Sequence, residues 1–373
     1  MEYRNNRLII DLKQIADNYL ALQKSLPSDT ALLAVVKADA YGHGLVKVSQ
    51  KLEAVGCPGF CVAIVEEGIT LREANIKGDI FLLGLINDPS IAVAIQYDLI
   101  LCVSSLEQLK RIQKQAALLN KCAKIHIAVN TGMNRIGIHT REELLSIVDF
   151  VGVHHNVDIV STFTHLAFAD ENPQKADYIS TFTQEQIKRY QAISDGLSLP
   201  DSAANSAGIV RIKPYHFTYA RAGIILYGYS PVCTEIPVKP CMSWQSEVVH
   251  VTDVRRGESI GYGRSFVANK DMRIAVAAVG YGDGYFRSLS NQARAIIRGE
   301  YANVVGRVCM DQIMVDVSHI DQVCPGDVVT LLGKSGDKVI SAEELAALAG
   351  TISYEILLNP SQRVYREYKD EPQ

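Results

Sequence analysis

Short apolar runs alternate with longer amphipathic segments through the first 230 residues, and this alternation constrains the fold more than any other feature of the chain. The runs are rich in β-branched residues and lie at 31–38, 60–63, 80–85, 99–105, 123–130, 157–165, 200–206 and 219–228. Between them, segments such as 44–56 and 105–119 place their apolar residues on one helical face. Continuous apolar strands, each followed by a helix, indicate a parallel sheet covered on both faces. Eight such units predict an α/β fold of the (β/α)₈ barrel type, and a doubly wound sheet is the alternative because the run at 200–206 is weak.

Beyond about residue 235 the helical periodicity almost disappears. Short strands follow one another, separated by Gly, Asn and Asp turns, with one helical pattern near 341–350. We therefore expect two domains: an N-terminal TIM-type barrel over residues 1–235 and a C-terminal mainly-β domain over residues 236–373.

The composition excludes several classes of protein. Hydrophobic residues make up 48% of the chain, charged residues 21%, and the net charge of −4 gives no reason to expect nucleic acid or an anionic membrane as a partner. No apolar run reaches the roughly 18 residues that a membrane-spanning helix needs. The eight cysteines are scattered and form no CxxC pair or zinc-type cluster. These features predict a cytoplasmic protein without structural disulfides or a metal site.

The first apolar run ends on Lys37, followed at once by Tyr41, Gly42, His43 and Gly44. In a barrel, the carboxyl ends of the strands form the active face. A lysine held there among apolar neighbours favours its neutral form, which makes the amine nucleophilic. Covalent chemistry with a carbonyl group or with pyridoxal phosphate needs such an amine. The alternative is a lysine that extends from the strand end into solvent.

Other predicted strand ends also carry polar residues. Arg135 follows the fifth run, His165 ends the sixth, and Arg221 lies inside the eighth. A lone histidine is more often a hydrogen-bonded core residue, but an arginine within a strand is almost never buried without partners. Asn205 and Ser206 end the seventh run. Backbone N–H groups near the eighth strand commonly bind phosphate in barrels, and Gly223 and Ile224 lie there.

The predicted β domain contains three glycine-rich motifs, "GYGRSF", "GYGDGYFR" and "VGRVCMDQIMVDV". They include Tyr262, Tyr281, Met310 and Asp311. None fits the Rossmann or P-loop pattern, so the motifs give no support for nucleotide binding. Taken alone, they are typical of hairpin turns with aromatic packing.

Together these motifs resemble those of one enzyme family. "AVVKADAYGHG" resembles the cofactor-lysine motif of bacterial alanine racemases, and "NTGMNRIG", "FTHLAFAD", "ANSAG", "ARAGIILYG", "SIGYGRSF", "GYGDGY" and "VCMDQIMVDV" follow in the order of that family. The resemblance spans the whole chain. It implies a barrel that binds pyridoxal 5′-phosphate, followed by a β domain.

The resemblance also implies roles for individual residues. Lys37 would hold the cofactor and act as one catalytic base, and Tyr262, from the partner subunit of a homodimer, would act as the other. Catalysis would be supported by His165, which would hold Tyr262 in place, by Arg221, which would donate to the pyridine nitrogen, and by Asp311, near Arg135. Cofactor binding would involve Lys37, Tyr41, Asn205, Ser206, Arg221, Gly223, Ile224 and Tyr354. Substrate binding would involve Arg135, Met310 and Tyr281.

These roles are chemically consistent with racemisation. Loss of the α-proton of an amino acid is difficult because the carbanion is poorly stabilised, and conjugation to the cofactor spreads its charge. One proton donor or acceptor on each face of the substrate, Lys37 and Tyr262, then suffices. A tyrosine base would need its pKa lowered by a nearby cation. Because the pKa of Arg221 is too high for it to release a proton, the pyridine ring should stay unprotonated.

The sequence departs from the family at two points. Many members carry a carbamylated lysine that orients the arginine, whereas this chain has Ala128 at that position. Arg135 must therefore be oriented by something else, with Asn130 or a bound anion as candidates. A histidine is also common in the segment before "ANS", where this chain has "PDSA", so the support of Arg221 should differ.

The predicted function is interconversion of L- and D-alanine to supply peptidoglycan synthesis, in a cytoplasmic homodimer with shared active sites. Two alternatives stay open. One is a serine racemase, such as the racemase domain of a membrane-anchored vancomycin-resistance protein. The other is a non-catalytic pyridoxal-phosphate carrier, against which Tyr262 and the β domain argue.

Overall fold

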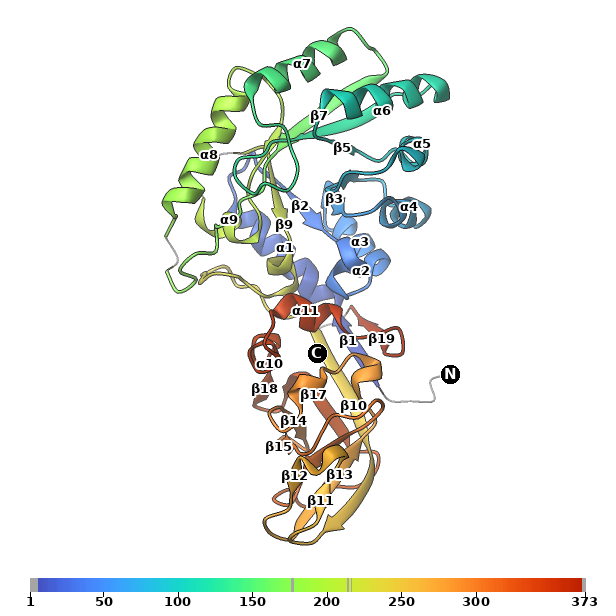
Figure 1. The fold of residues 1–373 in the computed structure, drawn as a ribbon, viewed down its shortest axis with the longest axis vertical. Helices are drawn as coiled ribbons and strands as arrows, with labels where there is room; N and C mark the ends of the chain where they lie inside the picture. The colour runs from blue at the N-terminus through green and yellow to red at the C-terminus, as the bar shows by residue number, and fades with distance from the viewer. Residues whose placement is uncertain (1–5, 176–177, 213–214, 216, 371–373) are drawn as a thin grey trace. The chain divides into compact units, whose positions relative to one another are not determined.

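The computed structural model describes residues 6–175, 178–212, 215 and 217–370 (Figure 1). The chain divides into two compact units. The barrel unit comprises Gln14–Ala40 and Gly44–Lys239, and the β unit comprises Met1–Lys13, Tyr41–His43 and Pro240–Gln373. Within the described residues, no helix is long and apolar enough to cross a membrane.

An eight-stranded parallel sheet forms the barrel unit, in the order β4-β3-β2-β9-β8-β7-β6-β5. Its strands are β2 (Ala31–Val35), β3 (Gly59–Val62), β4 (Asp79–Leu82), β5 (Leu101–Val103), β6 (Ala123–Ala128), β7 (Val157–Phe163), β8 (Asp201–Ser202) and β9 (Tyr219–Ala222). A parallel bridge between Phe81 and Ile100 joins the two ends of the sheet. The N–H of Ile100 donates to the carbonyl of Ile80 at 2.8 Å, and that of Leu82 to Ile100 at 2.9 Å. The predicted barrel is therefore confirmed, and the doubly wound alternative is wrong.

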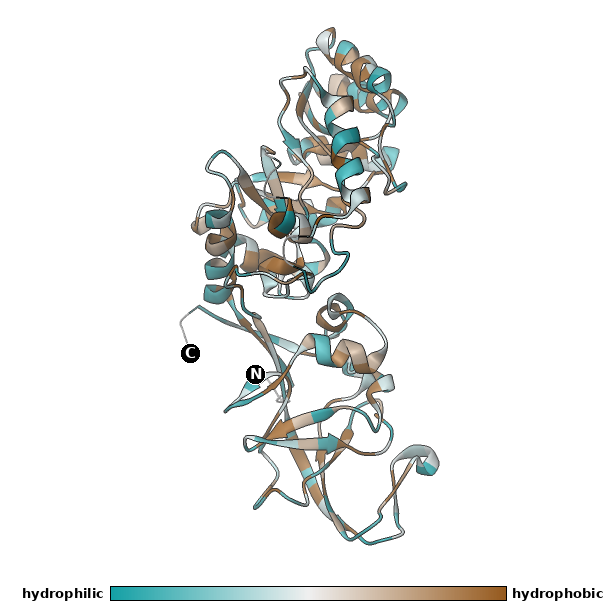
Figure 2. Ribbon diagram, turned by 90° about the vertical axis from the view of Figure 1, so that its left-hand side faces the viewer, coloured by the Kyte–Doolittle hydropathy of each residue, from teal (hydrophilic) through white to brown (hydrophobic). Residues whose placement is uncertain are grey.

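Helices lie outside these strands (Figure 1). They are α1 (Leu12–Ser25), α3 (Leu45–Ala54), α4 (Val65–Glu73), α5 (Asp88–Gln96), α6 (Leu106–Leu119), α7 (Arg141–Gly152), α8 (Thr181–Ser194) and α9 (Ser206–Arg211). Several begin at a residue whose side chain accepts a backbone N–H: Ser105 caps α6, Thr140 caps α7 and Ser180 caps α8. Figure 2 shows apolar strands beside helices of mixed polarity. The barrel core is accordingly mostly apolar, and the polar residues that begin the helices follow the strand ends.

The β unit is built on a nine-stranded sheet in the order β18-β17-β14-β15-β16-β13-β10-β1-β19. These strands are β1 (Arg7–Asp11), β10 (Met242–Val254), β13 (Met272–Ala277), β14 (Arg294–Ile297), β15 (Glu300–Val304), β16 (Ile313–Asp316), β17 (Val328–Ser335), β18 (Lys338–Ile340) and β19 (Tyr365–Lys369). A separate hairpin pairs β11 (Ser259–Ile260) with β12 (Phe266–Val267). Two helices, α10 (Ala342–Ala349) and α11 (Ser353–Leu358), lie between β18 and β19 in the chain. The sheet also includes a strand from the start of the chain, because β1 pairs with both β10 and β19.

Arg72 stabilises the closure of the barrel through hydrogen bonds to the backbone near the bridge between β4 and β5. Its guanidinium donates to two carbonyls in the turn 76–78 before β4, at 2.9 and 2.8 Å. It also donates to the carbonyls of Tyr97 and Asp98, at 3.1 and 3.0 Å, before β5. A single side chain thus fixes the approach of the two strands whose pairing closes the barrel.

We expect Arg72→Met to lower the free energy of unfolding by about 2 kcal/mol, because four backbone acceptors lose a charged donor. Arg111→Met is the matched control, since Arg111 makes only a solvent-exposed ion pair with Asp88 at 2.9 Å and should change stability by less than about 0.5 kcal/mol. Urea unfolding at neutral pH measures both. Equal losses for the two variants would contradict this role of Arg72.

Candidate functional site

Lys37 follows the carboxyl end of β2, as the sequence predicts, but the strand itself stops at Val35. The N–H of Val36 still donates to the carbonyl of Cys61 at the end of β3, at 2.9 Å. Lys37 then begins a short helical turn, α2 (Lys37–Tyr41). The lysine therefore leaves the barrel wall at the end where the carboxyl ends of all the parallel strands meet.

The α2 turn is left-handed. Ala38, Asp39, Ala40 and Tyr41 have φ angles of 52°, 54°, 52° and 53°. This conformation costs an L-residue about 1–2 kcal/mol, and it persists only where surrounding contacts determine it. Here the Ala40 N–H donates to the Val36 carbonyl at 2.8 Å, and the side chain of Asp39 accepts from the Leu45 N–H at 2.8 Å. Strain of this kind, next to a half-buried lysine, is typical of a functional site.

The Lys37 amine is biased towards its neutral form. Burial lowers its pKa most, and the positive charge of Arg135 lowers it further, whereas the negative charge of Glu67 acts in the opposite direction. A neutral amine at neutral pH can form a covalent bond with a carbonyl carbon or accept a proton. The geometry therefore supports the predicted chemistry of Lys37.

His165 lies among the same positive charges. Burial lowers its pKa to about 3, with further contributions from Arg221, Arg135 and Lys37. The ring is consequently neutral at pH 7. It lies close enough to Arg221, Arg135 and Lys37 for each of them to lower its pKa. These four residues, from four different strand ends, are brought to one end of the barrel, where the positive field favours an anionic ligand.

Arg221 is held rigidly within β9. It is 5% exposed, and it donates to the Ser202 hydroxyl, to the carbonyl of Thr164 at 2.6 Å and to that of Ala203 at 3.4 Å. Burial lowers the pKa of its guanidinium, but arginine side chains stay charged in proteins. We expect the support of Arg221 to differ from the family pattern, and in this chain the Ser202 hydroxyl accepts a hydrogen bond from Arg221. The sequence analysis did not identify Ser202. Its only signal was a position in the weakest of the predicted strands.

A cradle of hydrogen-bonding groups lies beside Arg221. Asn205 caps α9 by accepting the Gly208 N–H at 3.0 Å, and Ser206 is the first residue of that helix. The Ser206 hydroxyl accepts the Gly223 N–H at 3.1 Å, where the 3₁₀ turn η1 (Ile224–Tyr227) begins. Because its oxygen already accepts the N–H groups of Gly223 and Ile225, a further bond from Ser206 to a ligand has to be a donation. Such a donor set fits a phosphate group.

Ala128 is a buried alanine. Because alanine has no amine to carbamylate, this position cannot support Arg135 as the lysine of other family members does. Asn130 uses its side-chain oxygen for the N–H groups of Gly132 and Asn134, at 3.1 and 3.0 Å, and thus shapes the loop in which Arg135 lies. A cavity of about 20 Å³, enough for one water molecule, is lined by residues that include Ala128 and Arg135. The structure therefore gives Asn130 an indirect role.

The remaining predicted residues belong to the β unit. Tyr262, 71% exposed, begins the 3₁₀ turn η2 (Tyr262–Arg264), and Tyr281, 42% exposed, begins η3 (Tyr281–Asp283). The Tyr281 N–H donates to the carbonyl of Cys309 at 3.0 Å, and the Gly282 N–H to that of Met310 at 2.8 Å. These bonds make Tyr281 and Met310 parts of one rigid surface.

Three further residues complete the β-unit group. Asp311 forms an ion pair with Arg363 at 2.7 Å. The ring of Tyr41 lies 5.9 Å from that of Tyr354. The predicted site residues thus form two groups: one at the strand ends of the barrel unit and one in the β unit. Within the described residues, no group of His, Cys, Asp and Glu side chains could hold a metal ion.

Family models match both units. The N-terminal domain of alanine racemase matches residues 10–231, and the C-terminal domain matches residues 241–368. The chain belongs to the alanine racemase family. The alanine racemase of Halothermothrix orenii is 40% identical to it over 370 residues, which cover 97% of this chain and 96% of that protein.

Solved structures of the family superpose on the chain. An alanine racemase from Bartonella henselae, with covalently bound pyridoxal phosphate, has a TM-score of 0.87 at 28% identity, covering 98% of this chain and 99% of that one. A histidine racemase from Leuconostoc mesenteroides has a TM-score of 0.90 at 26% identity, covering 99% of both. The family fold therefore serves more than one amino-acid substrate.

We expect the His165 ring to stay neutral from pH 8 down towards its pKa of about 3. An unfolded histidine takes up a proton near pH 6.5, so acidification below that value favours the unfolded chain, and the folded state loses stability as the pH falls. NMR of protein labelled with ¹⁵N-histidine measures the titration, and the His165→Gln variant assigns the resonance. A titration step of His165 near pH 6.5 would contradict this environment.

Proposed function

We propose that this chain is a pyridoxal-phosphate-dependent alanine racemase that interconverts L- and D-alanine. The observation that carries the proposal is the half-buried Lys37 amine, whose pKa is lowered and which lies among Arg135, His165 and Arg221 at the carboxyl ends of the barrel strands. Membership of the alanine racemase family supports the same conclusion.

The residues of the barrel end fit pyridoxal phosphate. Lys37 offers the amine for the cofactor carbonyl, and Arg221 offers a permanently charged donor for the pyridine nitrogen. Ser206 and the N–H group of Ile224, at the start of η1, would donate to the phosphate, with Asn205 holding the turn before α9. From the β unit, Tyr41 and Tyr354 would complete the phosphate site. When bound, the cofactor supplies an electron sink for the substrate α-carbon.

The protein's own groups then move and hold the proton. Lys37 takes or returns the α-proton on one face of the substrate, and Tyr262 does so on the other, while His165 holds Tyr262. Arg135 and the Met310 N–H receive the substrate carboxylate. A charged donor that cannot release its proton, Arg221, keeps the pyridine nitrogen unprotonated and so limits side reactions.

Alanine is the substrate that the relatives support best, because curated proteins as similar as the one from H. orenii carry that name. The histidine racemase shows that side-chain preference changes within the fold. Serine therefore remains the informative competitor to test, since it differs from alanine by a single hydroxyl.

Incubation of the purified protein with L-alanine and with L-serine, separately, followed by chiral amino-acid analysis, tests the proposal. We expect D-alanine to form at least about tenfold faster than D-serine, because the similar curated proteins are alanine racemases and discrimination over a single group is commonly of this order. Faster formation of D-serine would make the chain a serine racemase. No D-amino acid from either substrate, with the cofactor still bound, would favour a carrier.

We further propose a homodimer in which each site takes Lys37 from one subunit and Tyr262 from the other. Tyr262, Tyr281 and Met310 are 71%, 42% and 53% exposed on the β unit, which leaves them available to a partner's barrel. A two-fold axis would give two equivalent sites. Such a racemase would supply D-alanine for peptidoglycan from the cytoplasm, a compartment consistent with its free cysteines.

Mixing two inactive variants tests the shared site. Lys37→Ala and Tyr262→Ala homodimers should each be nearly inactive. After joint unfolding and refolding in equal amounts, about half the dimers are mixed, and each has one intact site, so about a quarter of the wild-type activity should return. No recovery, with mixed dimers confirmed by mass, would place both residues in the same subunit's site.

A further inference from the structure

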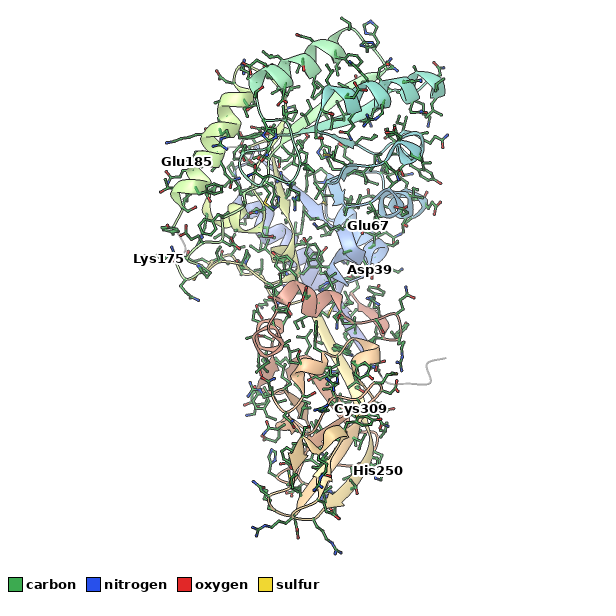
Figure 3. All side chains as sticks on the ribbon, in the orientation of Figure 1. Asp39, Glu67, Lys175, Glu185, His250 and Cys309 are labelled. Carbon is green, nitrogen blue, oxygen red and sulfur yellow. The ribbon has the colours of Figure 1, made fainter. Side chains whose placement is uncertain are left out.

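The side chain of Glu67 joins two neighbouring segments of the barrel (Figure 3). It lies in the first turn of α4, and one carboxylate oxygen accepts the N–H groups of Ala63 and Ile64, at 2.8 and 3.3 Å. The other oxygen accepts the N–H of Ala38 at 2.5 Å. Ala63 follows the end of β3, and Ala38 is the residue directly after Lys37. Glu67 therefore connects the end of one β/α unit to the left-handed turn α2 (Lys37–Tyr41) of the preceding unit, called the lysine turn below.

The chain contains a second glutamate in a comparable position, without that connection. Glu143 lies in the first turn of α7, and its carboxylate accepts the N–H groups of His139 and Thr140, at 2.6 and 3.0 Å. Both glutamates thus satisfy the backbone at the start of a barrel helix. The bond to Ala38 is an additional function of Glu67.

That bond reaches the lysine turn from outside. At the end of the turn, the Tyr41 ring lies 5.9 Å from that of Tyr354. Local hydrogen bonds run from the Ala40 N–H to the Val36 carbonyl, from the Gly44 N–H to the Asp39 carbonyl, and from the Leu45 N–H to the Asp39 side chain, at 2.8, 2.9 and 2.8 Å. They define the curvature of the turn. Glu67 fixes where the turn lies against the next strand, and with it the direction in which Lys37 leaves β2.

We propose that Glu67 is a positioning residue for Lys37, because its carboxylate anchors the left-handed turn at Ala38 to the end of β3. The proposal rests on the cofactor-binding role of Lys37. Glu67 touches neither cofactor nor substrate in this scheme. It holds the amine in a fixed place and adds a negative charge to its surroundings.

The charge has its own consequence. The groups that face the Lys37 amine electrostatically are Arg135, His165, Cys61 and Glu67. Burial and Arg135 lower the pKa of Lys37, and Glu67 raises it. Burial also raises the pKa of the Cys61 thiol to about 12, so that this group is neutral at pH 7. Removal of the Glu67 charge should therefore lower the pKa of Lys37 further.

The test is a titration of the full-length chain with pyridoxal phosphate, followed by absorbance of the covalent link, at pH values from 6 to 10. Affinity rises with pH until the amine is neutral, so the plateau reports the position of Lys37 and the midpoint reports its protonation. In Glu67→Gln, a single amide oxygen cannot serve both Ala38 and Ala63. We expect the plateau affinity to fall by about tenfold and the midpoint to move to lower pH.

Glu143→Gln is the matched control, since it removes the same charge from a helix start without touching the Lys37 turn, and it should match the wild type in both readouts. Glu67→Asp keeps the charge but is too short to bridge both segments. It should lower the plateau with a smaller shift of the midpoint, and it decides the test if Glu67→Gln does not fold. Wild-type plateau and midpoint in the folded Glu67 variants would overturn the proposal. Reduction and peptide mapping of the wild type separates this result from a failure of the Lys37 assignment.

Discussion

Partial burial of the Lys37 amine beside other positive charges is the constraint on which the rest of the site depends. A lysine in water is almost fully protonated at pH 7, and only desolvation or neighbouring positive charge makes its neutral form accessible. The barrel provides both, because β2 delivers Lys37, half-buried, to a strand end where the positive charge of Arg135 also acts on it. A helix terminus on an open surface would leave the amine hydrated and inert.

The same concentration of positive charge explains the neutral histidine. A protonated His165 beside Arg221 and Arg135 would add a further cation to this region, and its pKa falls to about 3 instead. The charge of Arg221 is matched by neutral oxygen acceptors, among them the Ser202 hydroxyl and the Thr164 carbonyl. A cofactor phosphate and a substrate carboxylate are the anions that this field would attract, so binding and catalysis draw on one electrostatic arrangement.

Much of this arrangement is visible in the sequence, because it depends on periodicity and strand ends. The apolar runs predict the barrel, and Lys37, Arg135, His165 and Arg221 follow or lie in those runs. Contacts that depend on distant partners could not be predicted. The left-handed turn at Ala38 uses residues with no preference for that conformation, and β1 joins the β-unit sheet only through pairing with β10 and β19. Ser202 and Glu67 carry no local signal, because Ser202 lies in a strand of two residues and a carboxylate at a helix start usually serves only as a cap.

The division into a barrel unit and a β unit separates two tasks. The barrel unit contains the Lys37 amine, the positive charges of Arg135 and Arg221, and the proposed phosphate donors. The β unit presents Tyr262, Tyr281 and Met310 as exposed residues. In the proposed mechanism, the barrel would carry the covalent chemistry and Tyr262 would supply the opposing base, so that each face of the substrate has a proton donor.

The most direct measurement of the central claim is borohydride reduction of the yellow, cofactor-bearing protein, followed by proteolysis and mass mapping of the modified peptide. The account predicts that the reduced cofactor is found on Lys37, in a peptide containing "VVKADAYGHG", with loss of the yellow absorbance. A cofactor mass on any other lysine, or yellow protein that borohydride does not modify, would contradict it.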